Sequence, residues 1–487
     1  MAGPSLLFSF LIAGFASLLS AFCYSEFAAH VPLSGSAYTF SYVTLGEIVA
    51  WFIGWNLTLE YAISASVVAR SWSNYLAALW NGFFPDSPMW LGLYNSTIPG
   101  VEWIAFSPMS IVIIGICTGL LMFGLKDSSK VNNILTLVNL SVILFIIIYG
   151  AFFVNPDNWV PFFPYGASGV FTGAGTCFFS FIGFDSVTTL AGEVKNPQFD
   201  LPVGIIGTLG IVSLLYVLVS LVLTGMVFYP NIDVNAPLAI AFQQVGQGWA
   251  SNLVSIGSLT TLSATTFVTL LGQPRVFYQM SVDGLFFEIF GRTDKNGTPV
   301  MGTLISGAFA AFFAFTLPLS SLTNMISIGT LMAFTVVCAG VLVLRLQDPL
   351  KPAQVPLSAF LYIILCTISC LVFIHAKYMP LWGNLLFLLP CVIYTFSFYI
   401  FPVIKVPTTF KTPLVPILPC MAIYVNLYLI YSLDIWSIVR VFLWTIVGLL
   451  IYFFYGIKHS RARLHQSNLP SFDPINQDGF DDKEFDE

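Results

Sequence analysis

The chain has 487 residues, of which 57% are hydrophobic and only 8% are charged, and its formal net charge is −6. A soluble domain of this length would expose too much apolar surface to water, so the composition predicts a chain that lies in lipid. The acidic balance gives no sign of a nucleic-acid surface, and the four histidines lack the spacing of a catalytic or metal site. We therefore expect a membrane protein that is not an enzyme.

Long apolar segments recur along most of the chain. A bilayer is crossed by about twenty residues of helix, and isolated strands cannot satisfy their backbone groups in hydrocarbon. We therefore predict an all-α polytopic membrane protein with thirteen spans. The predicted spans cover residues 5–27, 42–67, 108–125, 132–154, 169–190, 202–229, 250–272, 301–317, 322–345, 357–375, 382–404, 413–433 and 436–457.

The basic residues predict how these spans are oriented. Fourteen of the 17 Lys and Arg residues fall on the side of the membrane that also holds the C-terminus. Cytoplasmic loops are enriched in such residues, so this side is predicted to be the cytoplasm. Asn95, in the sequon Asn95-Ser96-Thr97, then lies outside and is a candidate glycosylation site. Residues 458–487 are acidic and poor in aliphatic side chains, which predicts a disordered cytoplasmic tail.

The segment from Cys177 to Pro197 places a glycine and an aspartate inside an apolar run. A carboxylate near mid-membrane costs about 2.5–3.5 kcal/mol on insertion scales, and a helical glycine costs roughly 1 kcal/mol. Such a cost points to a function for Gly183 and Asp185. A helix broken here and lining a solute pathway is one interpretation. A kinked helix whose aspartate pairs with a neighbouring span is the alternative.

Motifs spread along the chain resemble those of the cationic amino acid transporters, from Ala2 to about Ser460. The motif around Gly183 is shared with the wider amino acid, polyamine and organocation superfamily, and the motifs of the last two spans discriminate the cationic group. The residues that carry the resemblance are Ala2–Ser5, Cys23–Phe27, Val31-Pro32, Gly35–Tyr38, Trp55–Leu57, Val68–Ser73, Gly183–Asp185, Glu193–Pro197, Pro413–Pro416, Asn426, Tyr428, Ile451–Phe453, Tyr455-Gly456 and His459-Ser460.

This resemblance implies an architecture as well as a function. Such transporters have a core of two inverted five-helix repeats, as in the leucine transporter, followed in the cationic group by four extra helices. By this resemblance residues 1–346 are the transporter core, 347–457 are the four additional helices, and 458–487 are the tail. The family's first helix, with its glycine-rich unwound stretch, has no counterpart in the chain, so the core is expected to lack that helix.

The break predicts a substrate site. An unwound turn would free the carbonyls of Phe179, Ser180 and Ile182 to accept an ammonium group. Asp185 would stabilise the break or face the substrate. Phe181 and Phe184 are either packing residues or an aromatic gate.

Polar residues of the second span add candidates. At about 100° per residue, Asn56 and Glu60 share a helix face, and Glu47 is turned about 140° from Glu60. We expect Glu60, with Asn56, to contact the substrate side chain, although an interhelical hydrogen bond explains Glu60 equally well. Glu47 lies nearer the cytoplasmic end and is expected to be a structural or gate residue.

Three further groups are weaker candidates for the pathway. Glu26 lies one turn from His30 at a helix end, where an interfacial position is expected and a gate is the alternative. Glu193 is placed at the cytoplasmic mouth of the broken helix. Thr261 and Ser263 belong to a hydroxyl cluster that either lines the pathway or bonds to its own helix.

The resemblance and these residues predict transport of amino acids, most readily arginine, lysine and ornithine. The span 132–154 contains no Lys, Asp or Glu, whereas bacterial relatives often carry a proton-responsive lysine there. A singly charged substrate gains about 2.3 kcal/mol per 100 mV of membrane potential, which suffices for uniport with alternating access. The alternatives are a neutral amino acid or polyamine transporter and a truncated, transport-dead amino acid sensor.

The expected partners are few. The substrate is a small molecule and the chain contacts the lipid bilayer, with no cofactor, metal or nucleic acid. No cysteine in a predicted outside loop resembles the one that tethers some relatives to a single-span chain, so no obligate partner chain is expected. The predicted location is the plasma membrane, with the lysosomal membrane as the alternative and the C-terminus in the cytoplasm.

Overall fold

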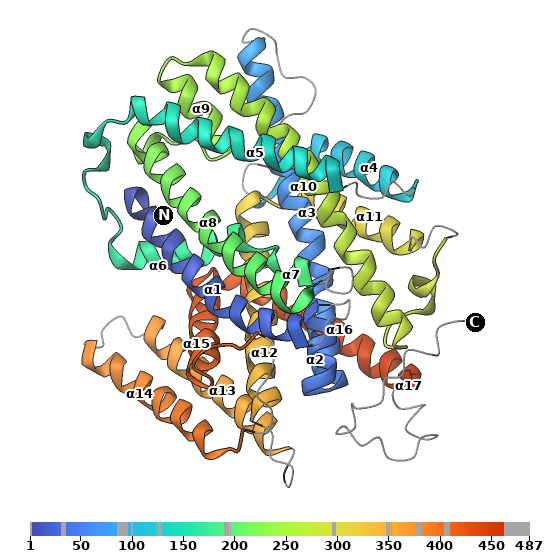
Figure 1. Ribbon diagram of the computed structural model, residues 1–487. Helices are drawn as coiled ribbons and strands as arrows, with labels where there is room; N and C mark the ends of the chain where they lie inside the picture. Colours follow the sequence, from blue (N-terminus) through green and yellow to red (C-terminus); the bar gives the residue numbers. More distant parts are fainter. Residues whose placement is uncertain are drawn as a thin grey trace.

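Packed helices make up nearly all of the chain that the computed structural model describes (Figure 1). The described residues are 2–30, 36–84, 96–98, 101–123, 129–188, 194, 196–294, 299–346, 351, 353–375, 381–403 and 410–461. The helices are α1 (Leu6–His30), α2 (Ser36–Leu45), α3 (Glu47–Phe83), α4 (Pro108–Met122), α5 (Ser129–Gly150), α6 (Gly166–Cys177), α7 (Phe184–Thr188), α8 (Pro197–Met226), α9 (Pro237–Gln244), α10 (Gly248–Val282), α11 (Val300–Thr316), α12 (Leu319–Arg345), α13 (Gln354–His375), α14 (Leu381–Ser397), α15 (Ile417–Ser432), α16 (Ile435–Ile451) and α17 (Ile457–His459).

The predicted spans agree with these helices in place and differ in length. Each of the thirteen predicted segments overlaps a helix or, at 169–190, a broken pair of helices. Seven of the described helices are long and apolar enough to cross a bilayer, and four shorter apolar helices accompany them. The largest difference is in α3, which continues to Phe83, well past the predicted end. The full count of spans and the inverted repeat stay predictions.

A small β-hairpin interrupts the helical pattern. Strand β1 (Ser96–Ile98) pairs antiparallel with β2 (Val101–Phe106), directly before α4. The prediction that the spans are helical is unaffected, because the hairpin lies between the second and third predicted spans. Outside hydrocarbon a strand does not need to satisfy every backbone group within its own segment.

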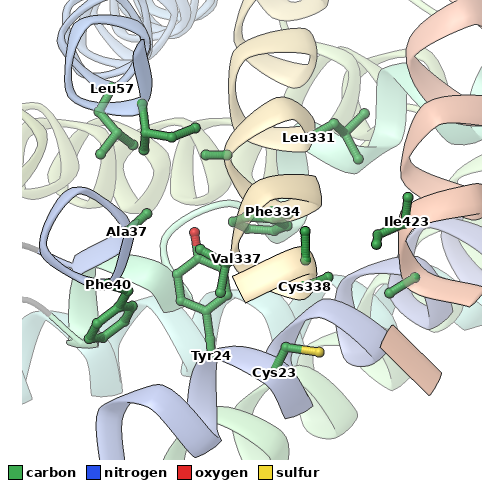
Figure 2. Close-up of a cluster of buried hydrophobic side chains, with 14 of the residues drawn as sticks. Cys23, Tyr24, Ala37, Phe40, Leu57, Leu331, Phe334, Val337, Cys338 and Ile423 are labelled. Atoms are coloured by element: carbon green, nitrogen blue, oxygen red, sulfur yellow. The ribbon is translucent and has the colours of Figure 1, made fainter. Parts of the chain in front are cut away.

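Helix α12 lies at the centre of the described structure. In the 18-residue apolar stretch of α12, 89% is buried inside the protein, whereas in that of α5 only 11% is buried. Helices α1, α2, α3, α13, α15 and α16 all contact α12. In Figure 1, α13 and α14 (orange) form one edge of the molecule, and α5 and α9 lie toward the opposite end. Side chains of α1, α2, α3, α12 and α15 meet in the buried cluster of Figure 2.

Helices α3 and α16 approach each other closely at Gly448. A Cβ atom added to Gly448 would lie 2.2 Å from Cδ1 of Trp55. The indole N–H of Trp51 donates to the Gly448 carbonyl over 2.9 Å. Only glycine therefore allows α16 to seat against the two tryptophans of α3.

We expect Gly448→Ala to destabilise the protein by about 1–3 kcal/mol, because the added methyl group overpacks the contact with Trp55. Gly119→Ala in α4 is the matched control, since a Cβ there meets no atom within 4 Å. That control should be neutral or stabilising by up to about 1 kcal/mol. Thermal unfolding of the detergent-purified variants measures both, and equal melting temperatures would contradict the close contact.

Candidate functional site

The chain between α6 and α7 is broken as the sequence predicts. After α6 a 3₁₀ turn, η4, covers Phe178–Phe181, and Ile182 then adopts an extended conformation with φ −69° and ψ 142°. Gly183 has φ +123°, a conformation that residues with a Cβ rarely adopt. Helix α7 begins at Phe184. The glycine thus lets the chain leave the helical path within an apolar segment.

Two of the three carbonyls predicted to be free are occupied by the protein itself. The Phe179 carbonyl accepts the N–H of Ile182 over 3.1 Å. The Ser180 carbonyl accepts the hydroxyl of Tyr216, which reaches across from α8 over 2.8 Å. These two carbonyls are thus not free in this conformation, because a buried carbonyl takes a nearby donor when one exists, and substrate contacts of Phe179 and Ser180 stay a prediction.

Asp185 stabilises the break. Its Oδ1 accepts the backbone N–H of Gly183 over 3.1 Å. The side chain is buried, with 2% of its surface exposed. Asp185 also lies within electrostatic range of Tyr24 and Glu60. The carboxyl group therefore holds the turn and lies in the same buried region as Tyr24 and Glu60.

Glu60 presents a carboxylate to this region from α3. It is 2% exposed, and its Oε2 has no hydrogen-bond partner among the described residues. Thr330 of α12 faces the same carboxylate, and its hydroxyl donates to the Ile326 carbonyl over 3.1 Å. A buried carboxylate oxygen without a donor is costly, and such a group calls for an explanation such as a ligand or an ion.

Aromatic side chains enclose the two carboxylates. The ring of Tyr24 meets Phe184 at a centroid distance of 5.6 Å and Phe334 at 5.0 Å. Figure 2 shows Tyr24 between Phe40 and Phe334, with its oxygen directed away from the α1 backbone. That hydroxyl is buried and has no partner within the described part of the chain. Tyr24 was not among the residues predicted for the site, although it falls in the motif Cys23–Phe27.

Phe181 and Phe184 are buried, with exposures of 3% and 6%. Phe181 packs edge-on against Tyr216, with ring centroids 5.3 Å apart. Phe184 packs against Tyr24 and Phe334, so both rings act as packing residues in this conformation. A gating role for either ring stays a prediction.

Three residues predicted for the site are hydrogen-bonded to other parts of the protein in this conformation. Asn56 donates to the carbonyl of Phe52 and accepts from Thr445 of α16, so its amide is already used.

The Thr261 and Ser263 hydroxyls donate to carbonyls one turn earlier in α10, and Ser263 also accepts the indole N–H of Trp72. Trp72 lies twelve residues beyond Glu60 on α3, roughly 18 Å along the axis. The structure therefore favours the alternative in which these hydroxyls bond to their own helix.

Glu26 is fully buried in an ion pair, and its expected interfacial position stays a prediction. Its two carboxylate oxygens accept from Nε and Nη2 of Arg345 over 2.6 and 2.9 Å. The backbone N–H of Thr412 donates to the same carboxylate over 2.8 Å. The sequence did not reveal this pairing, because the partner, at the end of α12, lies 319 residues away in sequence.

Glu47 lies apart from Glu60, as the helical angle predicts. Its carboxylate accepts the hydroxyls of Tyr452, over 2.8 Å, and Ser460. This pattern supports a structural role. Glu193, Asn95 and the tail beyond Arg461 lie outside the described residues, so the predictions made for them stay predictions.

A separate cavity of about 100 Å³ lies between α3, α10, α11 and α16. Its walls are almost entirely apolar and include Trp55, Phe277, Phe286 and Trp444. An amino acid carries an ammonium and a carboxylate, and this cavity offers little that would bind either. We therefore assign the candidate site to the break and not to this cavity.

Comparison with known proteins identifies the family. The model of the amino acid permease family matches residues 1–402, and the model of the permease C-terminus matches residues 410–460. The chain belongs to the amino acid permease family. It is a transporter and not an enzyme, and it is a polytopic membrane protein.

Individual relatives differ in the substrates for which they are named. The chain is 36% identical over 460 residues to the methylthioribose transporter of Bacillus subtilis (94% of this chain, 87% of the relative). It is 36% identical over 462 residues to the branched-chain amino acid permease BcaP of the same organism (94% and 87%). It is 35% identical over 531 aligned residues to cationic amino acid transporter 4 of Mus musculus (95% and 83%).

We expect Glu26→Gln to destabilise the protein by about 3–5 kcal/mol, because it leaves the Arg345 guanidinium buried without its counter-charge. The double variant Glu26→Gln with Arg345→Met should recover much of this loss, since no unpaired charge remains. Unfolding in detergent measures both variants. A loss below about 1 kcal/mol in the single variant, as for an exposed pair, would contradict a buried ion pair.

Proposed function

We propose that the protein carries cationic amino acids, such as arginine, lysine and ornithine, across the membrane by voltage-driven uniport. The observation that carries the proposal is the buried Glu60 carboxylate, whose Oε2 lacks a partner among the described residues and which lies within electrostatic range of Asp185 at the break. A guanidinium or ammonium group would supply the missing donor and offset the negative charge.

In this proposal each residue of the site has a defined role. Glu60 binds the cationic side chain of the substrate, and the carbonyl of Ile182 accepts its α-ammonium group. Asp185 holds Gly183 in the turn and adds negative charge.

The surrounding residues have supporting roles in the proposal. Phe181 and Phe184 exclude water, and Glu26 with Arg345 closes one end of α1 against α12. The inverted five-helix repeats, thirteen spans and alternating access belong to the same proposal.

The proposed location is the plasma membrane, with the lysosomal membrane as the alternative. The proposed C-terminus is cytoplasmic, which follows from the distribution of Lys and Arg. The protein is proposed to work without an obligate partner chain. Glycosylation at Asn95 and a cytoplasmic gate position for Glu193 are part of this arrangement.

A transporter of neutral amino acids is the second candidate. The rings of Tyr24, Phe184 and Phe334 line the same region and suit an apolar side chain. One bacterial relative is named as a branched-chain amino acid permease, which agrees with that pocket. A polyamine transporter and a transport-dead sensor are further outcomes of the same test.

Uptake into liposomes that contain the purified protein separates these candidates. Uptake of labelled arginine is measured in the presence of unlabelled lysine, alanine, leucine or putrescine. Inhibition by lysine and not by leucine supports the cationic proposal, and the reverse supports the neutral one. Strong inhibition by putrescine indicates a polyamine carrier, and no saturable flux indicates a sensor.

We expect Glu60→Gln to lower kcat/KM for arginine at least about tenfold, because one charge-assisted hydrogen bond to the substrate is lost. Glu288→Gln, which changes an exposed carboxylate outside the predicted spans, is the control. Proteoliposome uptake measures both. Equal kcat/KM values in Glu60→Gln and the unaltered protein would remove Glu60 from the site.

We expect arginine uptake to follow the membrane potential and to ignore sodium. A single positive charge gains about 2.3 kcal/mol per 100 mV, which corresponds to roughly fifty-fold accumulation. Potassium gradients with valinomycin set the potential in liposomes, and choline replaces sodium. Loss of uptake on sodium removal, or accumulation independent of potential, would contradict uniport.

A further inference from the structure

Helix α16 follows the first part of α3 with one contact per helical turn. On α3 the contacting residues are Glu47, Trp51 and Trp55, spaced four apart, with Asn56 beside the last of them. On the other side they are Tyr452, Gly448 and Trp444, again four apart, with Thr445 beside the last. We call this set the α3/α16 seam. Because the numbers rise on α3 as they fall on α16, the two helices run antiparallel.

The tryptophan pair is the strongest part of the seam. The Trp55 indole N–H donates to the Trp444 carbonyl over 2.7 Å, and the Trp444 indole N–H donates to the Trp55 carbonyl over 3.2 Å. The two rings stack with centroids 4.5 Å apart and planes 12° apart. This reciprocal arrangement fixes both the rotation and the height of α3 relative to α16.

At the seam, side chains also donate hydrogen bonds to backbone carbonyls of α3. The Trp55 carbonyl accepts the Thr58 hydroxyl over 2.7 Å in addition to the Trp444 indole. Asn56 donates to the Phe52 carbonyl over 2.8 Å and accepts from Thr445 over 3.3 Å. The bonds from Trp444 and Thr445 come from α16, so α16 restrains α3 at this point.

The seam ends one helical turn before Glu60. Asn56 and Glu60 are four residues apart and therefore lie on the same face of α3, about 6 Å apart along the axis. On its other side α3 faces α12, where the Asn56 carbonyl is 4.0 Å from a Cβ added to Gly329. A small rotation of α3 would turn the Glu60 carboxylate away from Asp185 and Thr330.

We propose that α16 is a positioning element of the transport site, and that Trp444 aims Glu60 at the helix break through the α3/α16 seam. Trp444 touches neither Glu60 nor the substrate in this proposal and acts only through α3. The effect on substrate rests on the proposed function of Glu60, whereas the effect on the α3 backbone does not.

The test variant is Trp444→Phe, which keeps an aromatic ring on Trp55 and removes the indole N–H. Trp436→Phe is the matched control, because Trp436 lies in the same helix, is 68% exposed and has no hydrogen-bond partner among the described residues. Each variant is measured in liposomes for the KM and kcat of arginine and of leucine, and in nanodiscs for hydrogen exchange at residues 56–62.

We expect Trp444→Phe to raise the KM for arginine about fivefold to tenfold with kcat unchanged, as for the loss of one hydrogen bond. Backbone amides at 56–62 should exchange faster by a similar factor, and any leucine uptake should be unaffected. In a Glu60→Gln background the same substitution should not change the arginine KM further. The control should match the unaltered protein in every measurement.

Two results would overturn the proposal. Unchanged exchange at 56–62 in Trp444→Phe means that the seam does not hold α3. A parallel loss for arginine and leucine, together with a lower melting temperature, means that Trp444 serves only general stability. If Glu60→Gln leaves the arginine KM unchanged, the proposed function fails, and hydrogen exchange alone then decides whether α16 positions α3.

Discussion

A helix that breaks inside hydrocarbon must satisfy its freed backbone groups within the protein, and the candidate site is arranged around that requirement. Asp185 accepts the Gly183 N–H, and Tyr216 donates to the Ser180 carbonyl. These bonds let η4 and α7 meet at an extended residue and a glycine with positive φ. The carboxylate that this turn requires also brings negative charge close to Glu60.

The helices around the break are tied together away from it. Tyr24 and Glu26 lie two residues apart on α1, and Phe334 and Arg345 lie on α12, so the aromatic contact and the ion pair join the same two helices. Helix α3 is held on its other side by α16 through paired tryptophans. Helix α3, which carries the buried carboxylate of Glu60, therefore contacts both α12 and α16.

Sequence reasoning succeeded where the cause is local. A glycine and an aspartate in an apolar run predict a break, and the structure has one at Gly183. A helix rotation of 100° per residue predicts that Glu47 and Glu60 point in different directions, and the two carboxylates have different neighbours. It did not find partners that are remote in sequence. Arg345 buries Glu26 from 319 residues away, and Tyr216 occupies the Ser180 carbonyl from another helix. The pairing of α3 with α16 depends on tertiary packing that hydropathy alone does not specify.

In the proposed mechanism Glu60 and the break form a single binding site for a cationic amino acid. The most direct measurement is a cryo-EM structure of the protein in nanodiscs with saturating arginine. We expect the guanidinium within hydrogen-bonding distance of Glu60 Oε2, about 3 Å, with the α-ammonium at the Ile182 carbonyl. Arginine bound elsewhere, with the Glu60 carboxylate still unpaired, would contradict the account.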